Sequence, residues 1–65
     1  MDKPINAIVV DDDVLSRRLT CAVLRELGVA HPLQAEDGTT ALAAIRASEA
    51  PVDLALCDLE MAGMD

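Results

Sequence analysis

Apolar positions along the chain follow two different periods and predict three strands that alternate with two helices. The first strand covers the run from Ile5 to Val10, which ends in "AIVV". Three of these last four residues are β-branched, which is typical of a strand buried on both faces of a parallel sheet. The run stops at three adjacent aspartates, Asp11 to Asp13.

The segment from Asp13 to Leu27 predicts an amphipathic helix, because its apolar residues recur every three or four positions. The stripe expected to face the core consists of Leu15, Leu19, Ala22, Val23 and Leu27. Asp12 or Asp13 is expected to cap the N-terminus of this helix, and Gly28 stands where a C-terminal cap is needed.

Two further segments predict strands. "VAHPLQA" (29–35) is expected to lie at a sheet edge, because Pro32 has no N–H to donate to a neighbouring strand. "APVDLALCD" (50–58) begins with a helix breaker and then runs apolar as far as Asp58. It is therefore expected to be a second strand buried on both faces.

The second helix is expected within "EDGTTALAAIRAS" (36–48). Its Asp-Gly pair favours a turn, and Thr39 or Thr40 is expected to cap the helix. Leu42 and Ile45 are expected to point inward. The resulting order of strand, helix, strand, helix, strand is typical of an α/β fold with a doubly wound parallel sheet.

This topology is expected to bring three carboxylates together at one edge of the sheet. For the strand order 2-1-3, ligands bind outside the carboxyl ends of the first and third strands, where the winding reverses. Asp11 and Asp12 follow the first strand, and Asp58 follows the third. We expect the three side chains to converge there, although adjacent like charges repel one another.

A divalent cation would relieve this repulsion. Carboxylate oxygens suit Mg²⁺, which takes one or two carboxylates, keeps several waters and accepts phosphate oxygens as ligands. With the cation held by Asp12 and one oxygen of Asp58, the other oxygen of Asp58 could attack phosphorus and form an aspartyl phosphate.

Composition narrows the remaining possibilities. A chain of 65 residues makes one small domain, and its net charge of -7 with no aromatic residue argues against binding to nucleic acid or to an anionic membrane. Cys21 and Cys57 form no CxxC motif and are interpreted as small buried apolar residues. The apolar run near the N-terminus is too short for a signal peptide or a membrane span, so a cytoplasmic location is expected.

Several charged residues receive a structural interpretation. Glu49 and Asp53 are interpreted as surface charges, and His31 as an exposed loop residue. Arg17 and Arg18 are interpreted as solvated charges on the first helix, where they could also steer a partner.

Three phrases in the right order resemble the first half of the response regulator receiver domain of two-component signalling: "AIVVDDDVLSRRL", "AEDGTTAL" and "VDLALCDLEMAGMD". The resemblance implies a flavodoxin-like fold that stops after its third strand, with residues 1–65 forming the N-terminal half of a receiver domain. It also implies a non-enzymatic module that a histidine kinase or a phosphotransfer protein phosphorylates.

The resemblance assigns roles by position. Asp58 becomes the phosphoacceptor and a metal ligand, Asp12 a direct Mg²⁺ ligand, and Asp11 a ligand through water. Glu60 would offer its backbone carbonyl to the metal. Asp13 falls where the family varies and keeps only its capping role.

Two departures from the family pattern stand out. Ala62 occupies a position where the family usually has proline, and the sequence ends at Asp65, before the hydroxyl residue and the lysine that the family uses to hold the phosphoryl group. The third strand is therefore expected to self-associate through an unpaired edge. The attached output is not determined, although the last phrase is similar to receivers joined to cyclic-di-GMP phosphodiesterase domains.

The sequence is also compatible with two other functions. "VVDDDVL" also fits a haloacid-dehalogenase-like phosphatase with Asp11 as nucleophile and Asp13 as acid/base. That family usually has Thr or Val where Leu15 stands, and it leaves Asp58 unexplained. The other alternative is an interaction module that is never phosphorylated.

Overall fold

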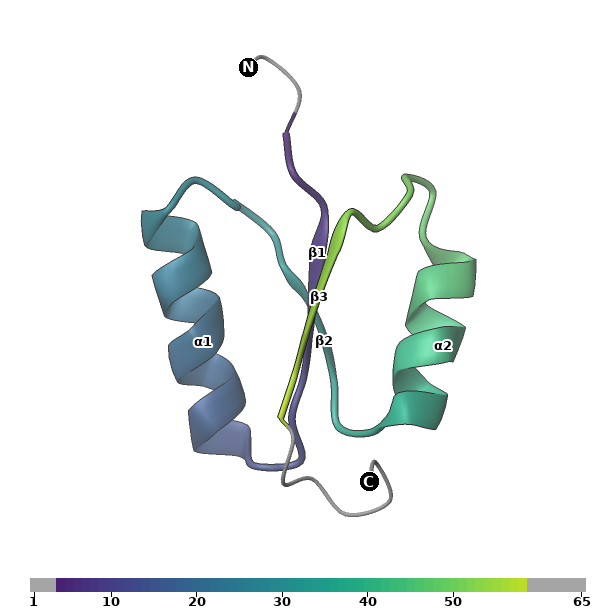
Figure 1. Ribbon diagram of the computed structural model, residues 1–65, viewed down its shortest axis with the longest axis horizontal. Coiled ribbons are helices and arrows are strands. Elements are labelled where there is room, and N and C mark those ends of the chain that lie inside the picture. Colours follow the sequence, from purple (N-terminus) through teal and green to yellow (C-terminus); the bar gives the residue numbers. More distant parts are fainter. Residues whose placement is uncertain (1–3, 59–65) are drawn as a thin grey trace.

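The computed structural model describes residues 4–58. Its three strands form one parallel sheet in the order β2-β1-β3, and its two helices lie on opposite faces of that sheet (Figure 1). The elements are β1 (Ala7–Val10), α1 (Val14–Glu26), β2 (Leu33–Ala35), α2 (Gly38–Ala47) and β3 (Leu54–Cys57). This confirms the doubly wound α/β arrangement and the edge position of β2. Neither helix is long and apolar enough to cross a membrane.

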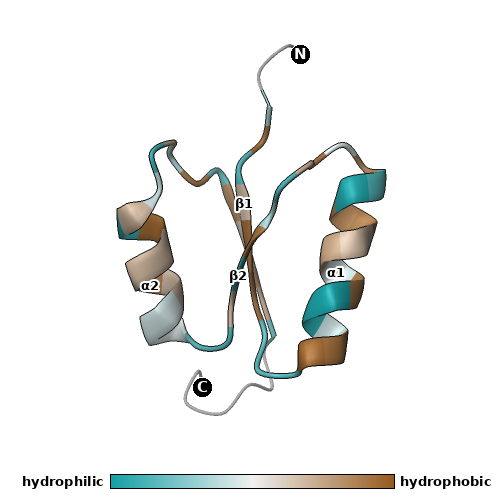
Figure 2. Ribbon diagram, turned by 180° about the vertical axis from the view of Figure 1, so that it is seen from behind, coloured by the Kyte–Doolittle hydropathy of each residue, from teal (hydrophilic) through white to brown (hydrophobic). Residues whose placement is uncertain are grey.

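Strand β1 forms the centre of the core, as predicted. All four of its residues are at most 2% exposed. Their side chains alternate between the two faces: Ala7 and Val9 pack on the α1 side, whereas Ile8 and Val10 pack on the α2 side. Brown, apolar segments accordingly run through the middle of the sheet in Figure 2.

Both ends of α1 are capped by the residues that the sequence indicated. The Asp13 side chain accepts a hydrogen bond from the Ser16 N–H at 3.0 Å. At the other end Gly28 adopts a φ of 104°, a conformation that favours glycine. The Val29 N–H then reaches back to the Leu24 carbonyl at 2.9 Å, which completes a Schellman motif.

The predicted inward face of α1 was wrong. Leu15, Leu19 and Leu27 are 74%, 67% and 75% exposed, and the buried residues of the helix are Cys21 and Leu24. At 3.6 residues per turn these two lie on nearly the opposite side of the helix from the leucine stripe. The Schellman motif explains why this face of α1 is buried. It links Leu24 to Val29, and both residues pack in the same core cluster.

The predicted burial of β3 was also wrong. All four of its residues are exposed, with Leu54 at 42% and Leu56 at 36%. Within residues 4–58, β3 is an edge strand whose only sheet neighbour is β1, and the two helices pack mainly on β1 and β2. Cys57 is exposed for the same reason, whereas Cys21 is buried as expected.

The predicted inward residues of α2 are only partly covered. Leu42 is 54% exposed and Ile45 is 37% exposed. Both line an apolar groove of about 560 Å³ that also includes Ala55 and Cys57 of β3. The two residues do face the sheet side, but the part of the sheet nearest to them is its sparsely covered edge.

The cap of α2 is Asp37 rather than Thr39 or Thr40. The Asp37 side chain accepts a hydrogen bond from the Thr40 N–H at 2.7 Å. This bond and one from the Thr40 hydroxyl lower the pKa of Asp37 below its ordinary value of 3.8. The charged carboxylate of an aspartate accepts hydrogen bonds from the unpaired N–H groups at a helix start and interacts favourably with the helix dipole. This explains why Asp37, rather than either threonine, caps α2.

A pH-dependent contribution to stability follows from this cap. Because the pKa of Asp37 is lower in the folded state, its contribution is present above about pH 4 and is lost as the pH falls through the lowered value. Asp37→Ala should lower the melting temperature by a few degrees at pH 7, and Asp37→Asn, which keeps the cap but not its charge, should lower it by a smaller but measurable amount. Thermal unfolding at several pH values tests this, since the advantage of wild type over Asp37→Asn should shrink below pH 4. A constant difference between these two proteins would contradict the assignment.

Candidate functional site

The pairing of β1 with β3 brings the ends of these two strands together. Val10 is opposite Cys57 in the parallel register, and the Asp58 N–H donates to the Val10 carbonyl at 3.1 Å. Asp11 and Asp58, each the residue after its strand, therefore leave the sheet side by side. This is the switch point between strands one and three that the sequence predicted.

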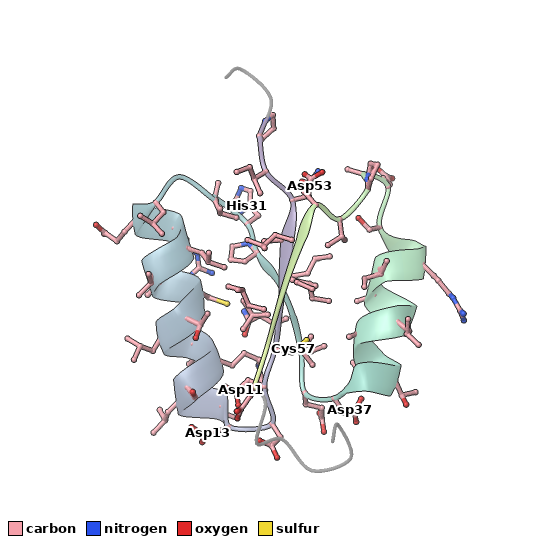
Figure 3. All side chains as sticks on the ribbon, viewed as in Figure 1. Asp11, Asp13, His31, Asp37, Asp53 and Cys57 are labelled. Carbon is pink, nitrogen blue, oxygen red and sulfur yellow. The ribbon has the colours of Figure 1, made fainter. Side chains whose placement is uncertain are left out.

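The opposite end of β3 is fixed by Asp53, which the sequence indicates only as a surface charge. The Asp53 N–H donates to the Asn6 carbonyl at 2.7 Å, and the Asn6 N–H donates to Asp53 Oδ2 at 2.9 Å. Figure 3 shows Asp53 at one end of the sheet and Asp11 at the other. Asp53 thus helps to fix the register of β3 against β1, and this register determines where Asp58 lies. In the sequence, only the position of Asp53 directly before the strand indicates this role.

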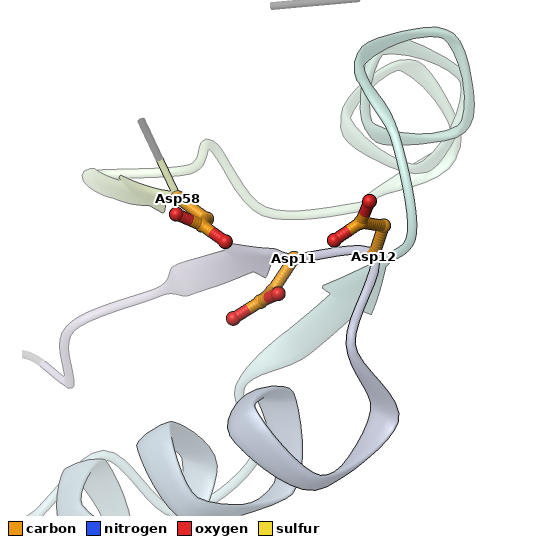
Figure 4. Close-up of side chains that lie close together, drawn as sticks. All are labelled: Asp11, Asp12 and Asp58. Carbon is orange, nitrogen blue, oxygen red and sulfur yellow. The ribbon is translucent and has the colours of Figure 1, made fainter. Parts of the chain in front are cut away.

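Asp11, Asp12 and Asp58 converge as predicted. Each offers a carboxylate oxygen, and these oxygens all lie within 4.8 Å of one another. Asp11 is buried at 6% exposure, Asp58 is half-buried and Asp12 is exposed. Figure 4 shows the three side chains gathered around the end of β1, with Asp58 arriving from β3. The backbone carbonyl expected from Glu60 lies outside the described residues.

The Asp11 carboxylate is held by its own loop. Its Oδ1 accepts a hydrogen bond from the Asp13 N–H at 2.9 Å. This bond, followed by one from the Ser16 hydroxyl, lowers the pKa of Asp11 below 3.8. Arg17 and Asp58 lower the pKa further, and burial opposes them. Asp11 is therefore a carboxylate at neutral pH and can serve as a metal ligand.

A polar groove of about 400 Å³ opens beside the cluster. Asp11 and Asp58 line it together with Ser16 and Thr20 of α1 and the end of β3. It would admit water molecules or a small anion next to the carboxylates. The larger apolar groove beside α2 includes none of the three aspartates, so groove size alone would point away from the acidic site.

The donor set fits a hard cation. The cluster contains carboxylate oxygens only, which suit Mg²⁺, whereas zinc sites in proteins are usually built with nitrogen or sulfur ligands. One buried, one half-buried and one exposed ligand leave part of the coordination shell to water or phosphate oxygens. A cation bound by carboxylates at this edge of the sheet would remain accessible to a phosphoryl donor.

Comparison with known proteins identifies the family. The sequence profile of the response regulator receiver domain matches residues 7–65. The chain belongs to this family. Receiver domains bind Mg²⁺ at an acidic cluster, and the convergence of Asp11, Asp12 and Asp58 gives this chain such a cluster. The three parallel strands and two helices match a truncated flavodoxin-like receiver fold.

A curated relative of this receiver chain is the cyclic di-GMP phosphodiesterase RocR from Pseudomonas aeruginosa. The two are 36% identical over 61 residues, which cover 94% of the receiver chain and 15% of RocR. The chain thus spans about one seventh of the length of this relative. No solved structure is similar enough to count as a match.

Proposed function

We propose that the chain supplies the phosphoacceptor site of a receiver domain, in which Asp58 takes a phosphoryl group from a histidine kinase or a phosphotransfer protein. The observation that supports this most strongly is the meeting of Asp11, Asp12 and Asp58 within 4.8 Å at the switch point of the sheet. Membership of the receiver family supplies the reaction type.

Each carboxylate has a separate role in this proposal. Asp12 would hold Mg²⁺ directly, Asp11 would hold it through water, and Asp58 would contribute one oxygen. The backbone carbonyl of Glu60 is proposed as a further ligand. When bound, the cation neutralises charge on the phosphoryl oxygens and on the cluster.

The other oxygen of Asp58 is the nucleophile. It forms the new O–P bond while the N–P bond of a phosphohistidine breaks, and the electron pair of that bond returns to the imidazole nitrogen. A carboxylate nucleophile needs no general base. The half-buried position of Asp58 beside the polar groove is consistent with in-line approach of a donor.

The structure disfavours the phosphatase alternative. That reading requires Asp13 as the acid/base partner of Asp11, but the Asp13 side chain accepts the Ser16 N–H as the cap of α1. Asp13 is also not among the residues that converge on the cluster. The alternative of a module that is never phosphorylated is decided by experiment.

Incubation of the full-length protein with acetyl phosphate and Mg²⁺, followed by mass measurement of the intact protein, tests the proposal. The expected result is the addition of a single phosphoryl group that is stable in acid and labile in base. Continuous release of inorganic phosphate from a phosphomonoester would support the phosphatase instead. No incorporation from acetyl phosphate or from any histidine kinase would support the interaction module.

We also propose that residues 1–65 form the N-terminal half of a cytoplasmic receiver domain. Its output is proposed to be a cyclic-di-GMP phosphodiesterase, and the support for this is the 36% identity to RocR. In such an arrangement the phosphoryl group would shift a pre-existing equilibrium of the receiver and thereby change the activity of the attached output.

The edge of β3 leads to a prediction for the 65-residue chain when it is isolated as such. Within the described residues, β3 presents one unpaired edge of apolar residues, a template on which another chain can add a strand. We expect this polypeptide to self-associate, and sedimentation in Mg²⁺ at several concentrations measures it. Leu56→Lys, which places a charge on the edge strand, should favour the monomer. A wild-type chain that sediments as a monomer at all concentrations would contradict the prediction.

A further inference from the structure

Arg17 is held between three elements of the fold. Its Nη1 donates to the backbone carbonyl of Asp11 at 2.7 Å, and its Nε donates to Gln34 Oε1 at 3.3 Å. The side chain thus leaves α1, contacts β2 and reaches the end of β1. It is half-buried, whereas the neighbouring Arg18 is exposed. In the sequence, both arginines have the pattern of solvated charges on a helix.

The atom that Arg17 binds matters for the acidic cluster. The Asp11 carbonyl belongs to the peptide that joins Asp11 to Asp12. This peptide is planar, so a hydrogen bond to its oxygen restricts the rotation of the whole unit. The Cα atoms at its two ends carry two of the three clustered carboxylates.

A second hydrogen bond holds the same turn from the other side. The Asp11 N–H donates to the Ala35 carbonyl of β2 at 3.0 Å. Both polar backbone groups of Asp11 therefore have a partner. The N–H is bound to β2 directly, and the carbonyl is bound to the guanidinium of Arg17, which in turn contacts β2. Arg17 therefore supplies one of the two contacts that hold the backbone from which Asp11 and Asp12 leave the sheet.

We propose that Arg17 is a positioning residue for the cation site, which orients the Asp11–Asp12 peptide so that both carboxylates face the ion. This inference rests on the proposed function, because it assumes that the cluster binds Mg²⁺. Residues that orient metal ligands typically change metal affinity by about 10- to 100-fold when they are replaced.

The charge of Arg17 has the opposite effect on affinity. A cation close to the cluster repels Mg²⁺, so removal of the charge alone should strengthen binding. Loss of positioning should weaken binding. The sign of the change therefore separates the two roles.

The test is calorimetric titration of Mg²⁺ into the full-length protein for wild type, Arg17→Met, Arg17→Lys and Arg18→Met. Arg17→Met should weaken binding by about tenfold. Arg18→Met makes the same change of charge one position away and should leave affinity unchanged or slightly stronger. Arg17→Lys keeps the charge, but its single ammonium group cannot hold Gln34 and the Asp11 carbonyl in one plane, so it should also bind more weakly than wild type.

Phosphorylation gives a readout that a purely structural role would not move. In Arg17→Met the Mg²⁺ concentration for half-maximal phosphorylation of Asp58 should rise, while the rate at saturating Mg²⁺ should be close to that of wild type. If Arg17→Met does not fold, Arg17→Lys decides by the same two measurements. Wild-type affinity in a folded Arg17 variant would overturn the inference and leave the proposed function standing. Absence of Mg²⁺ binding in wild type would overturn both.

Discussion

Asp58→Asn is expected to abolish phosphoryl transfer to the full-length protein. The amide has nearly the same shape as the carboxylate but lacks the anionic oxygen that attacks phosphorus. The Asp58 N–H still donates to Val10, so the end of β3 should keep its place. Intact-mass measurement after treatment with acetyl phosphate and Mg²⁺ should show no added phosphoryl group.

A matched control separates loss of the nucleophile from loss of negative charge. Asp13→Asn makes the same substitution near the cluster, and asparagine retains the capping function of Asp13. This variant should be phosphorylated to the wild-type extent. A phosphoryl group found undiminished in Asp58→Asn would mean that another carboxylate is the acceptor.

Asp12→Ala is expected to remove most of the stabilisation that Mg²⁺ gives to the protein. A ligand that binds only the folded state stabilises it by about 2.7 kcal/mol at 100 times its Kd. Asp12 is the exposed member of the cluster and is proposed to bind the ion directly. Its removal should therefore nearly eliminate the shift of melting temperature that Mg²⁺ produces in wild type.

The same variant should behave differently without the ion. Removal of one of three neighbouring negative charges relieves repulsion, so Asp12→Ala should be at least as stable as wild type in a chelating buffer. Thermal unfolding with and without Mg²⁺ measures both effects, with Asp13→Asn again as control. Equal Mg²⁺-induced shifts in wild type and Asp12→Ala would contradict the role of Asp12.

The meeting of Asp11 and Asp58 could be predicted from the sequence because it depends on few facts. Each residue follows an apolar run, and a helix lies between successive strands, which makes the strands parallel. Parallel strands place their carboxyl ends at one edge, and the strand order places these two side by side. None of these steps requires knowledge of side-chain packing.

The face of α1 could not be predicted in this way. Periodicity reveals that a helix has an apolar face, but α1 has one face with Leu15 and Leu19 and another with Cys21 and Leu24. The choice between them depends on the Schellman motif and its contact with Val29, which only the folded chain shows. The prediction that β3 is buried was wrong for a related reason. An apolar strand is buried only where other elements cover it.

The contacts of long polar side chains could not be predicted from the sequence either. Arg17 looks like a solvated helical charge in the sequence, because nothing in the pattern reveals that its guanidinium reaches the Asp11 carbonyl. Asp37 was overlooked as a cap because two threonines follow it, and both also favour helix starts. The site residues were thus more predictable than the residues that support them.

The hydrogen bonds at both ends of β3 determine which changes in chain length the site can tolerate. Asn6 fixes Asp53 at the start of the strand, and Val10 fixes Asp58 at its end. Insertions between α2 and Val52, which packs against the core, would alter only the connecting loop and leave the carboxylates in place. A single residue inserted within β3 would shift the register and turn the acceptor toward the other face of the sheet. The sequence distance between Asp11 and Asp58 is therefore free to drift over evolution, whereas the length of the strand itself is not.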